Sequence, residues 1–485
     1  MHKPADLFDR EWEWGRLVDF ITDPRPTPTL GVVSGRRRQG KTMLLQSMAE
    51  QAGGFFFEAV EGQPAEQLRL LAAALGEHLQ LPAALDLPDW SSALDALLDL
   101  AGERSLPVVL DEFSYLVTTS PSLPSLLQAA LSPARRRRKP TRLVVCGSAI
   151  SLMGSLLTAN APLRGRAGLE LVVDGFDYRT AADFWKLGDQ PDVAFAVFAV
   201  LGGTPAYARE FVREDAPVDE SDVQRWLAER VLDPASPLFR EGPTLLAEDP
   251  ELSTVRDRSL YHSVLAAVAG GNRTTSGIAS YVRRSSDQLA HPLTVLVEAG
   301  LLDRAEDPLR RGRPQYRVRE PIIRFHHAVM RPRWAALQRR TIDWPRIYPT
   351  LRAQIFGPAF EELARTWAER FASPATLGGD LERVGQTVVS DPVGRVSHEV
   401  DVLVVGTAPD GAHGVLAVGE AKAGEVMTRR QVERLRRVRE LLGSRAVPGC
   451  RLLCFGATGF APELLAGQLS PDVELVDLDR LYRGS

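Results

Sequence analysis

The stretch SGRRRQGKTMLL, residues 34–45, decides how the N-terminal part of the chain folds. Gly35 and the later Gly40-Lys41-Thr42 fit the pattern G-x-x-x-x-G-K-[ST], in which glycines let backbone N–H groups point at phosphate oxygens. The apolar run TLGVVSG precedes the motif and a helical run, MLLQSMAEQ, follows it. This context predicts a nucleotide site in which Lys41 reaches the β- and γ-phosphates and Thr42 holds Mg²⁺. The binding residues expected from the loop itself are Gly35, Gln39, Gly40, Lys41, Thr42 and Met43.

Two further apolar runs end in polar residues that suit nucleotide hydrolysis. LPVVLDEF ends in Asp111 and Glu112, which we expect to hold Mg²⁺ through water and to polarise the attacking water, respectively. Such an acid pair is also common as plain solvation of a strand end, but its combination with the phosphate-binding loop favours catalysis. In CGSAISLM, Ser148 either senses the γ-phosphate or serves as a turn or cap residue.

Residues 1–235 alternate apolar runs with helical stretches, which predicts an α/β domain built on a parallel sheet. The five strand candidates are TLGVVSG, GGFFFEAV, LPVVLDEF, TRLVVCGS and LELVVDGF. Just before the last of them, APLRGRAG supplies Arg164 and Arg166 as candidates for a finger that stabilises charge on the γ-phosphate. The Pro- and acid-rich stretch 233–251 is expected to be a linker or a short lid.

Residues 250–340 have the pattern of a winged helix-turn-helix. Two helical runs are followed by SDQLAHPLTVLVEAG, whose apolar residues fall on one face, and then by two strands around RRGR. The presumed recognition helix has no Arg or Lys between Ser286 and Gly300, which argues against base readout. A cluster of arginines can instead serve phosphates, or the whole segment is a structural arm between the outer domains. These arginines are Arg283, Arg284, Arg310, Arg311 and Arg313.

Residues 345–485 form a third expected domain, in which two strands carry carboxylates. SHEVDVLVVG contains Asp401, and VLAVGEAKAG contains Glu420 and Lys422, which share one face because they are two positions apart. The Gly-containing reversal TAPDGAHG predicts a hairpin that brings Asp401 and Glu420 together. Two carboxylates there suit Mg²⁺, with Lys422 orienting or deprotonating a water and Glu361 adding a carboxylate from the preceding helix.

The use of lysine supports this interpretation of the third domain. Of 58 basic residues only five are lysine, and two of these stand at 41 and 422, where a site would use a compact ammonium group. The following helix carries seven Arg against two Glu between residues 428 and 445, which suits a polyanion or an ordinary solvated face.

The motifs of the first domain resemble those of a known family. FDRE, GRRRQGKT, LDEF, CGSAISLM, PLRGRA and GGTPAY are similar to motifs of prokaryotic AAA+-like ATPases of the STAND class, in the archaeal-type branch. The resemblance covers about residues 5–235. It implies that Asp9–Glu11, including Arg10, and Gly203–Pro205 lie near the base and ribose. It also implies that nucleotide state controls a conformational switch or assembly into a homo-oligomer.

The third domain resembles the PD-(D/E)xK nuclease superfamily, a restriction-endonuclease-like α/β fold. The order helix-Glu, strand-Asp, strand-Glu-x-Lys, helix carries the resemblance, and Gln431 matches a recurrent position on the helix. The sequence departs from the pattern because no proline precedes Asp401. The three domains in series are similar to archaeal-type ATPases whose last region has no known function.

Composition limits the possible partners and compartments. The net charge is only −4, so a nucleic-acid surface must be local. Three cysteines give no disulfide framework, and no leader or membrane-spanning run is evident, so a cytoplasmic protein is expected. The sequence favours ATP-coupled, Mg²⁺-dependent cleavage or remodelling of nucleic acid, DNA rather than RNA. The alternative is a nucleotide switch whose inactive nuclease-like domain binds protein or DNA, while the Arg-free helix disfavours a sequence-specific regulator.

Overall fold

The computed structural model describes the chain except for residues 26–28, 84, 105, 133–140, 159–160, 250–251, 253–254, 256 and 467–469. The side chains at 103, 104 and 311 are not described either. The basic stretch ARRRRKP at 134–140, whose sequence is typical of a connector, and the side chain of Arg311 therefore lie outside the described parts.

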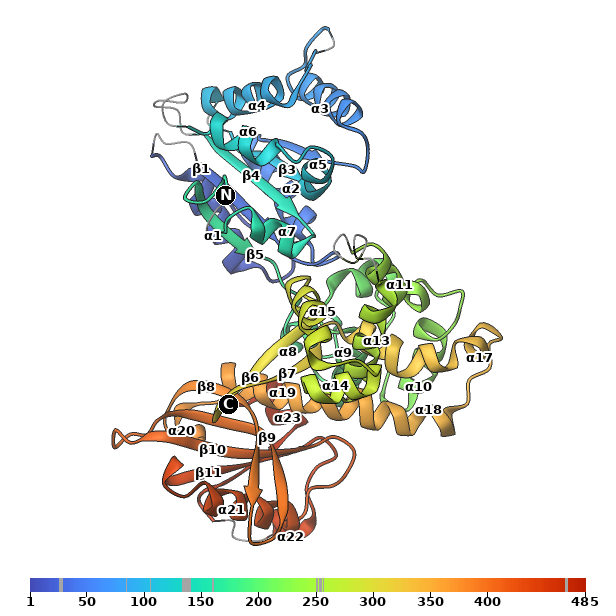
Figure 1. Ribbon diagram of the computed structural model, residues 1–485, viewed down its shortest axis with the longest axis vertical. Coiled ribbons are helices and arrows are strands. Elements are labelled where there is room, and N and C mark those ends of the chain that lie inside the picture. Colours follow the sequence, from blue (N-terminus) through green and yellow to red (C-terminus); the bar gives the residue numbers. More distant parts are fainter. Residues whose placement is uncertain are drawn as a thin grey trace.

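A parallel sheet of five strands forms the centre of the N-terminal part, as the sequence predicts (Figure 1). The strand order is β2-β3-β4-β1-β5. The strands are β1 (Thr29–Ser34), β2 (Phe55–Glu58), β3 (Val108–Asp111), β4 (Arg142–Gly147) and β5 (Ala167–Val172). The flanking helices are α1 (Glu11–Thr22), α2 (Lys41–Ala52), α3 (Pro64–His78), α4 (Trp90–Arg104), α5 (Phe113–Thr119), α6 (Leu123–Ala130) and α7 (Ile150–Ser155).

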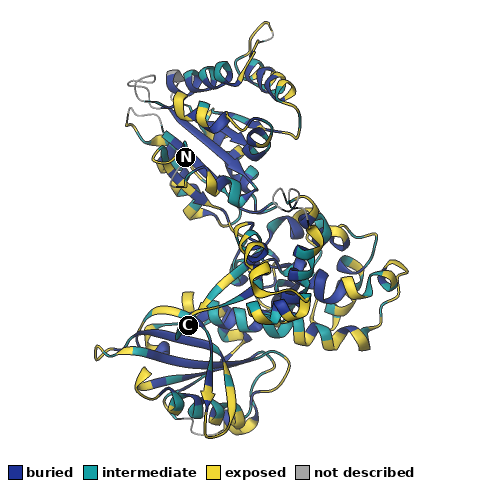
Figure 2. Cartoon of the chain, viewed as in Figure 1, coloured by how far each residue is buried: buried dark blue, intermediate teal, exposed yellow. Residues whose placement is uncertain are grey.

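Helices cover both faces of this sheet, which explains why its strands are continuous apolar runs. Val33 and Val144 pack with α1 and α2 on one face, whereas Val32 and Val145 pack with α3 to α7 on the other. Figure 2 shows the central strands of this part as fully buried. The carboxyl ends of β1, β3 and β4 therefore meet at one edge, where a ligand can bind.

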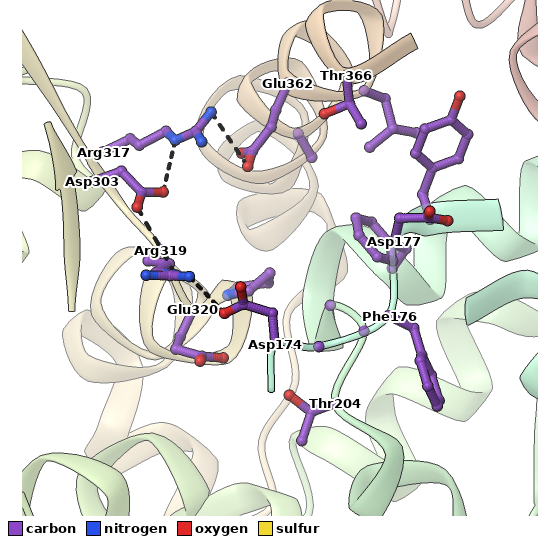
Figure 3. A pocket seen from close by; sticks show the side chains of 18 of the residues that line it. Asp174, Phe176, Asp177, Thr204, Asp303, Arg317, Arg319, Glu320, Glu362 and Thr366 are labelled. Atoms are coloured by element: carbon purple, nitrogen blue, oxygen red, sulfur yellow. Dashed lines mark hydrogen bonds and ion pairs between the residues drawn. The ribbon is translucent and has the colours of Figure 1, made fainter. Parts of the chain in front are cut away.

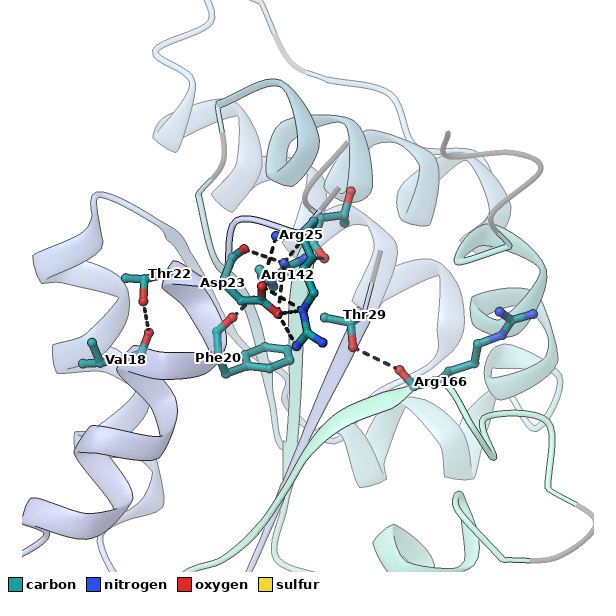
Figure 4. Close-up of polar contacts among 9 residues, drawn as sticks. Val18, Phe20, Thr22, Asp23, Arg25, Thr29, Arg142 and Arg166 are labelled. Carbon is teal, nitrogen blue, oxygen red and sulfur yellow. Dashed lines mark hydrogen bonds and ion pairs between the residues drawn. The ribbon is translucent and has the colours of Figure 1, made fainter. Parts of the chain in front are cut away.

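Arg142 at the start of β4 holds the connection between α1 and β1 (Figure 4). The residue is 2% exposed, and its guanidinium donates to the carbonyl oxygens of Phe20, Asp23 and Arg25 at 3.1, 2.6 and 2.9 Å. These carbonyls come from the end of α1 and the turn after it, so one side chain fixes the helix against the sheet.

A helical segment follows β5 and packs away from the parallel sheet. It contains α8 (Tyr178–Phe184), α9 (Pro191–Leu201), the short turns η1 (Tyr207–Phe211), η2 (Glu220–Asp222) and η3 (Leu227–Val231), α10 (Val223–Trp226) and α11 (Pro237–Ala247). Helix α11 lies inside the stretch expected to be a linker or lid. Its Pro237 is tolerated in the first turn, where the missing N–H is not needed, and its apolar face is buried.

The middle segment has the predicted order of three helices and a two-stranded antiparallel hairpin. These are α13 (Arg258–Ala269), α14 (Thr275–Val282), α15 (Ser286–Glu298), β6 (Leu302–Asp307) and β7 (Arg310–Val318). Short helices then lead to the last part of the chain. They are α16 (Pro321–Phe325), η4 (His326–Met330), η5 (Arg331–Arg333), α17 (Trp334–Gln338), α18 (Trp344–Thr350) and η6 (Leu351–Phe356).

The C-terminal part is a five-stranded mixed sheet with the order β12-β11-β10-β9-β8. Helix α19 lies on the side of the sheet that faces the middle segment, and α21 lies on the opposite side (Figure 1). Along the chain come α19 (Gly357–Arg370), α20 (Pro374–Leu377), β8 (Asp380–Asp391), β9 (Val396–Thr407), β10 (His413–Lys422), α21 (Arg429–Leu442), η7 (Gly443–Arg445), β11 (Ala446–Gly456), α22 (Pro462–Leu465), β12 (Val473–Asp477) and α23 (Leu478–Arg483). The predicted β9–β10 hairpin is confirmed, with Gly419 opposite Val402.

One hydrophobic core runs without a break from Tyr178 in α8 to Tyr482 in α23. The last helix returns to the helical segment, where Tyr178 and Arg179 donate to the carbonyl oxygen of Leu481 at 2.8 and 2.9 Å. The two cores on the faces of the parallel sheet are separate from it. The molecule is therefore built of two packing units that meet beside the phosphate-binding loop.

We expect Arg142→Ala to destabilise the N-terminal part by about 2 kcal/mol or more, because buried carbonyl oxygens lose their donor. Scanning calorimetry measures this as a lower Tm. The control Arg25→Ala removes a side chain that is 80% exposed and should change stability by less than about 0.5 kcal/mol. Equal Tm values for the two variants would contradict the role given to Arg142.

Candidate functional site

The phosphate-binding loop connects β1 to α2 in the geometry that the motif requires. Gly35 and Gly40 have φ values of 151° and 86°, and a Cβ on Gly35 would lie 2.2 Å from the carbonyl oxygen of Val173. Lys41 is buried, and its Nζ donates to the carbonyl oxygen of Arg36 at 2.8 Å. Burial lowers the pKa of this ammonium group, although nearby Glu112 and Asp111 oppose the change. The loop therefore holds a desolvated cation at the start of a helix.

The acid pair lies beside this loop. Asp111 is fully buried at the end of β3, and its Oδ2 accepts a hydrogen bond from Thr42 Oγ1 at 2.7 Å. Glu112 follows in the left-handed region, with φ 49°, and its Oε2 accepts from Ser148 Oγ at 3.0 Å. The structure thus brings Lys41, Thr42 and the acid pair together with Ser148. The hydroxyl oxygen of Thr42 and the carboxylate of Asp111 fit Mg²⁺, which prefers oxygen ligands.

Arg10 and the Gly203–Pro205 turn both reach the loop at Gln39. Arg10 donates to the carbonyl oxygens of Gln39 and Asp174 at 3.2 and 2.6 Å, and its guanidinium lies 4.7 Å from the ring centroid of Phe176. Gln39 Nε2 donates to Thr204 Oγ1 at 3.3 Å, one residue before Pro205. Arg10 therefore stabilises the conformation of the phosphate-binding loop. Met43, whose Sδ accepts from Arg209 at 3.7 Å, lies in the first turn of α2 beside it.

Arg166 lies at the wrong edge of the sheet for the role expected of it. Strand β5 runs parallel to β1, with Ala167 opposite Leu30 and Val172 opposite Ser34. Arg166 therefore adjoins Thr29, whose Oγ1 donates to its carbonyl oxygen at 3.3 Å (Figure 4). The six residues of β1 separate it from the loop by roughly 17 Å. Arg166 does not contribute to the nucleotide site of its own chain.

Three arginines of the loop contact the other packing unit, which the sequence analysis did not anticipate. Arg36 donates to the carbonyl oxygen of Ala299 at 3.0 Å and pairs with Glu320 at 2.9 Å. Arg37 pairs with Glu248 at 2.8 Å. Arg38, which has a left-handed φ of 70°, pairs with the buried Glu241. The only signal in the sequence was the run RRR at the variable positions of the motif.

The hairpin brings together the carboxylates predicted in the C-terminal part. Asp401 Oδ2 accepts from the backbone N–H of Ala421 at 2.9 Å, so Asp401 lies between Glu420 and Lys422. Burial, followed by the charges of Glu361 and Glu420, raises the pKa of Asp401 to about 7. The side chains of Asp401, Glu420 and Glu361 thus form an acidic cluster at the edge of the sheet.

Basic side chains already neutralise much of this acidic cluster. Glu420 is 1% exposed and pairs with Lys422 at 2.7 Å and with Arg434 at 2.8 Å. Glu361 pairs with Arg273 of the middle segment at 2.8 Å. Among the residues that the structure describes, no three His, Cys, Asp or Glu side chains are arranged to hold a metal ion. The oxygen donors suit Mg²⁺ chemically, but Arg273 and Arg434 would first have to release the carboxylates that they pair with.

Gln431, which the resemblance places at a recurrent position, caps the start of a helix. Its Oε1 accepts from the N–H and the hydroxyl of Thr428 at 3.0 and 2.6 Å, which completes a capping box at the start of α21. The amide oxygen therefore caps the N-terminal end of α21.

Comparisons with known proteins agree with the nucleotide site. Residues 7–211 match the family described as an ATPase domain predominantly from Archaea. This part of the chain is an archaeal-type P-loop ATPase domain. The chain is 24% identical to the uncharacterized protein MJECL04 of Methanocaldococcus jannaschii over 338 residues. The aligned residues cover 69% of this chain and 71% of that protein.

A solved structure shows the same fold, and a second one is similar to this chain. The Walker-type ATPase PABY2304 of Pyrococcus abyssi matches with a TM-score of 0.50 and 20% identity, over 67% of this chain and 97% of that one. The ORC2 protein of Aeropyrum pernix, solved in ADPNP-ADP complexes, matches with a TM-score of 0.43 and 15% identity, over 67% and 93%. Within the described ranges, no helix is long and apolar enough to cross a membrane.

We expect Gly203→Ala to weaken ATP binding at least tenfold, because its Cβ would lie 1.8 Å from the carbonyl oxygen of Phe176 and would displace the turn that contacts Gln39. Equilibrium titration with a fluorescent ATP analogue measures the effect. Gly76→Ala in α3 is the matched control, since nothing lies within 4 Å of its Cβ. Unchanged affinity in Gly203→Ala would show that the turn is remote from the nucleotide.

Proposed function

We propose that the ATPase domain controls Mg²⁺-dependent cleavage or remodelling of nucleic acid by the C-terminal part, with DNA as the expected substrate. The observation that carries this proposal is the position of Asp401 beside Glu420 and Lys422 on neighbouring strands. The order of α19, β9, β10 and α21 supports it, because the resemblance to PD-(D/E)xK nucleases rests on the same order.

In the nucleotide site, each residue has a role that follows from its position. Lys41 can exchange its bond to the Arg36 carbonyl for bonds to the β- and γ-phosphates. Thr42 and Asp111 would hold Mg²⁺, which neutralises phosphate charge when bound. Glu112 would polarise the attacking water, and Ser148 holds its carboxylate toward the edge of the sheet where the γ-phosphate is expected.

In the C-terminal part, Asp401 and Glu420 would hold Mg²⁺, which polarises the scissile phosphate and acidifies a bound water. Lys422 would orient the nucleophilic water, since its Nζ lies at the partly exposed end of β10. Exposed arginines, which bind phosphate without reading sequence, would supply affinity. They are Arg283, Arg284 and Arg313 of the winged-helix-like middle segment and Arg429 and Arg430 of α21.

The alternative is a nucleotide switch whose C-terminal part is an inactive module that binds protein or DNA. Arg434 favours this alternative, since it donates a hydrogen bond to Glu420 Oε1 at 3.1 Å and forms an ion pair with Oε2 at 2.8 Å, so that it contacts both oxygens of a proposed metal ligand. Under this alternative the acidic cluster is a buried salt-bridge network that fixes the fold.

For the ATPase, we expect Lys41→Ala to abolish ATP binding, because no other side chain of the loop can replace the buried ammonium group. Glu112→Gln should keep ATP binding and lower turnover about 100-fold or more, since an amide cannot act as a base. Filter binding and phosphate release measure the two effects. Full turnover in Glu112→Gln would assign the catalytic role elsewhere.

For the nuclease site, we expect Lys422→Gln to abolish cleavage of plasmid DNA in Mg²⁺ and ATP while ATP turnover persists. Lys186→Gln is the matched control, because Lys186 is 77% exposed and pairs with Glu214. Gel assays of both variants decide between the two proposals. Wild-type cleavage in Lys422→Gln would exclude this site, and no cleavage by any protein would support the inactive module.

A further inference from the structure

Arg273 brings a cation from the middle segment into the acidic cluster. Its Nη1 donates to Glu361 Oε2 at 2.8 Å and to Gln386 Oε1 at 3.3 Å. Its own carbonyl oxygen accepts from the N–H of Tyr316 in β7 at 2.7 Å, so the hairpin of the middle segment fixes its backbone. The guanidinium is therefore held in place from one part of the molecule and binds a carboxylate of another.

The charges around Arg273 belong to the cluster. Burial acts to lower the pKa of its guanidinium, yet Glu361, followed by Asp401 and Glu399, raises it overall. Lys422, Arg434 and Arg365 also carry positive charge here and belong to the C-terminal part: Arg365 donates to the carbonyl oxygen of Asp401 at 2.9 Å. The backbone of Arg273 belongs to the middle segment, so it leaves the acidic cluster only when the middle segment moves relative to the C-terminal part.

The interface around Arg273 is polar, which suits a contact that opens. Thr387 Oγ1 donates to Asp307 Oδ2 at 2.9 Å. Arg317 pairs with Asp303 within the middle segment at 3.0 Å and with Glu362 of α19 at 3.4 Å (Figure 3). A charged cavity of about 330 Å³ lies between the middle segment, α19 and the turn at Gly203. The two segments share the apolar core elsewhere, but beside Arg273 they meet through ion pairs and hydrogen bonds, so a local separation there exposes little buried apolar surface.

At its other end, the same middle segment contacts the phosphate-binding loop of the nucleotide site. Arg36 of the phosphate-binding loop contacts Ala299, at the end of α15, and Glu320, after β7. Lys41 donates to the carbonyl oxygen of that Arg36, so a nucleotide that takes Lys41 removes a hydrogen bond from the loop that holds the segment. The middle segment thus connects the two candidate sites.

We propose that Arg273 is a built-in cation that blocks the acidic cluster as a divalent metal site while the middle segment is docked. The proposal rests on the proposed function of that cluster as a metal site. In the docked state, Glu361 is neutralised and the guanidinium stands beside the carboxylates that a metal would need. Withdrawal of Arg273 frees Glu361 and leaves the cluster one charge more negative, which favours a divalent cation.

Calorimetric titration of the nucleotide-free full chain with Mn²⁺ tests this proposal without relying on cleavage. We expect Arg273→Ala to bind Mn²⁺ at least tenfold more tightly than wild type. The control Arg304→Ala removes a 45% exposed arginine of the same segment and should behave as wild type. The double variant Arg273→Ala/Asp401→Asn should bind Mn²⁺ no more tightly than wild type. This result would assign the metal to the acidic cluster and exclude the phosphate-binding loop.

Plasmid cleavage by the same proteins separates this proposal from the proposed function. Tighter Mn²⁺ binding together with ATP-independent cleavage by Arg273→Ala supports both. Tighter binding without cleavage supports the block by Arg273 and contradicts the nuclease. Equal, measurable affinity in wild type and Arg273→Ala overturns the block alone, and absence of Mn²⁺ binding in every variant overturns both.

Discussion

The buried guanidinium of Arg36 is the contact on which the relation between the two packing units depends. It is 9% exposed and lies between the phosphate-binding loop, the end of α15 and Glu320. A buried charge is tolerated only when it is fully paired, and removal of one partner costs several kcal/mol. Any change in the loop therefore acts on the middle segment. Arg37 and Arg38 repeat the arrangement toward Glu248 and Glu241, so three consecutive residues tie the nucleotide site to the second unit.

The continuous core from Tyr178 to Tyr482 explains how such a contact can matter at a distance. The helical segment, the middle segment and the C-terminal sheet share apolar packing, and α23 closes the unit by returning to α8. Packed cores transmit displacement because they do not deform continuously. Within this unit the contact of Arg273 with Glu361 is polar, so relative movement would concentrate there. The Gly203–Pro205 turn lies where the second unit meets Gln39 of the loop.

The sequence predicted features encoded locally. The five parallel strands were recognisable because both faces of their sheet are buried, and the hairpin of Asp401 and Glu420 because a glycine-containing reversal joins two apolar runs. Strand β8 was missed because its residues alternate between buried and exposed without an apolar run. Helix α11 was missed because Pro237, Pro243 and acidic residues resemble a linker. Arg166 was misplaced because β5 runs parallel to β1, so a residue before β5 lies at the edge of the sheet opposite the loop. The partners of Arg36 and Arg273 depend on contacts between distant segments.

Hydrogen exchange with and without a non-hydrolysable ATP analogue tests most directly whether the nucleotide site acts on the middle segment. The amide of Tyr316, which donates to the carbonyl oxygen of Arg273, and that of Gly300, which follows the carbonyl bound by Arg36, report the two ends of the segment. The account predicts that the analogue speeds or slows exchange at both amides in wild type, and at neither in Arg36→Ala. Exchange at both positions that is the same with and without the analogue in wild type would contradict it.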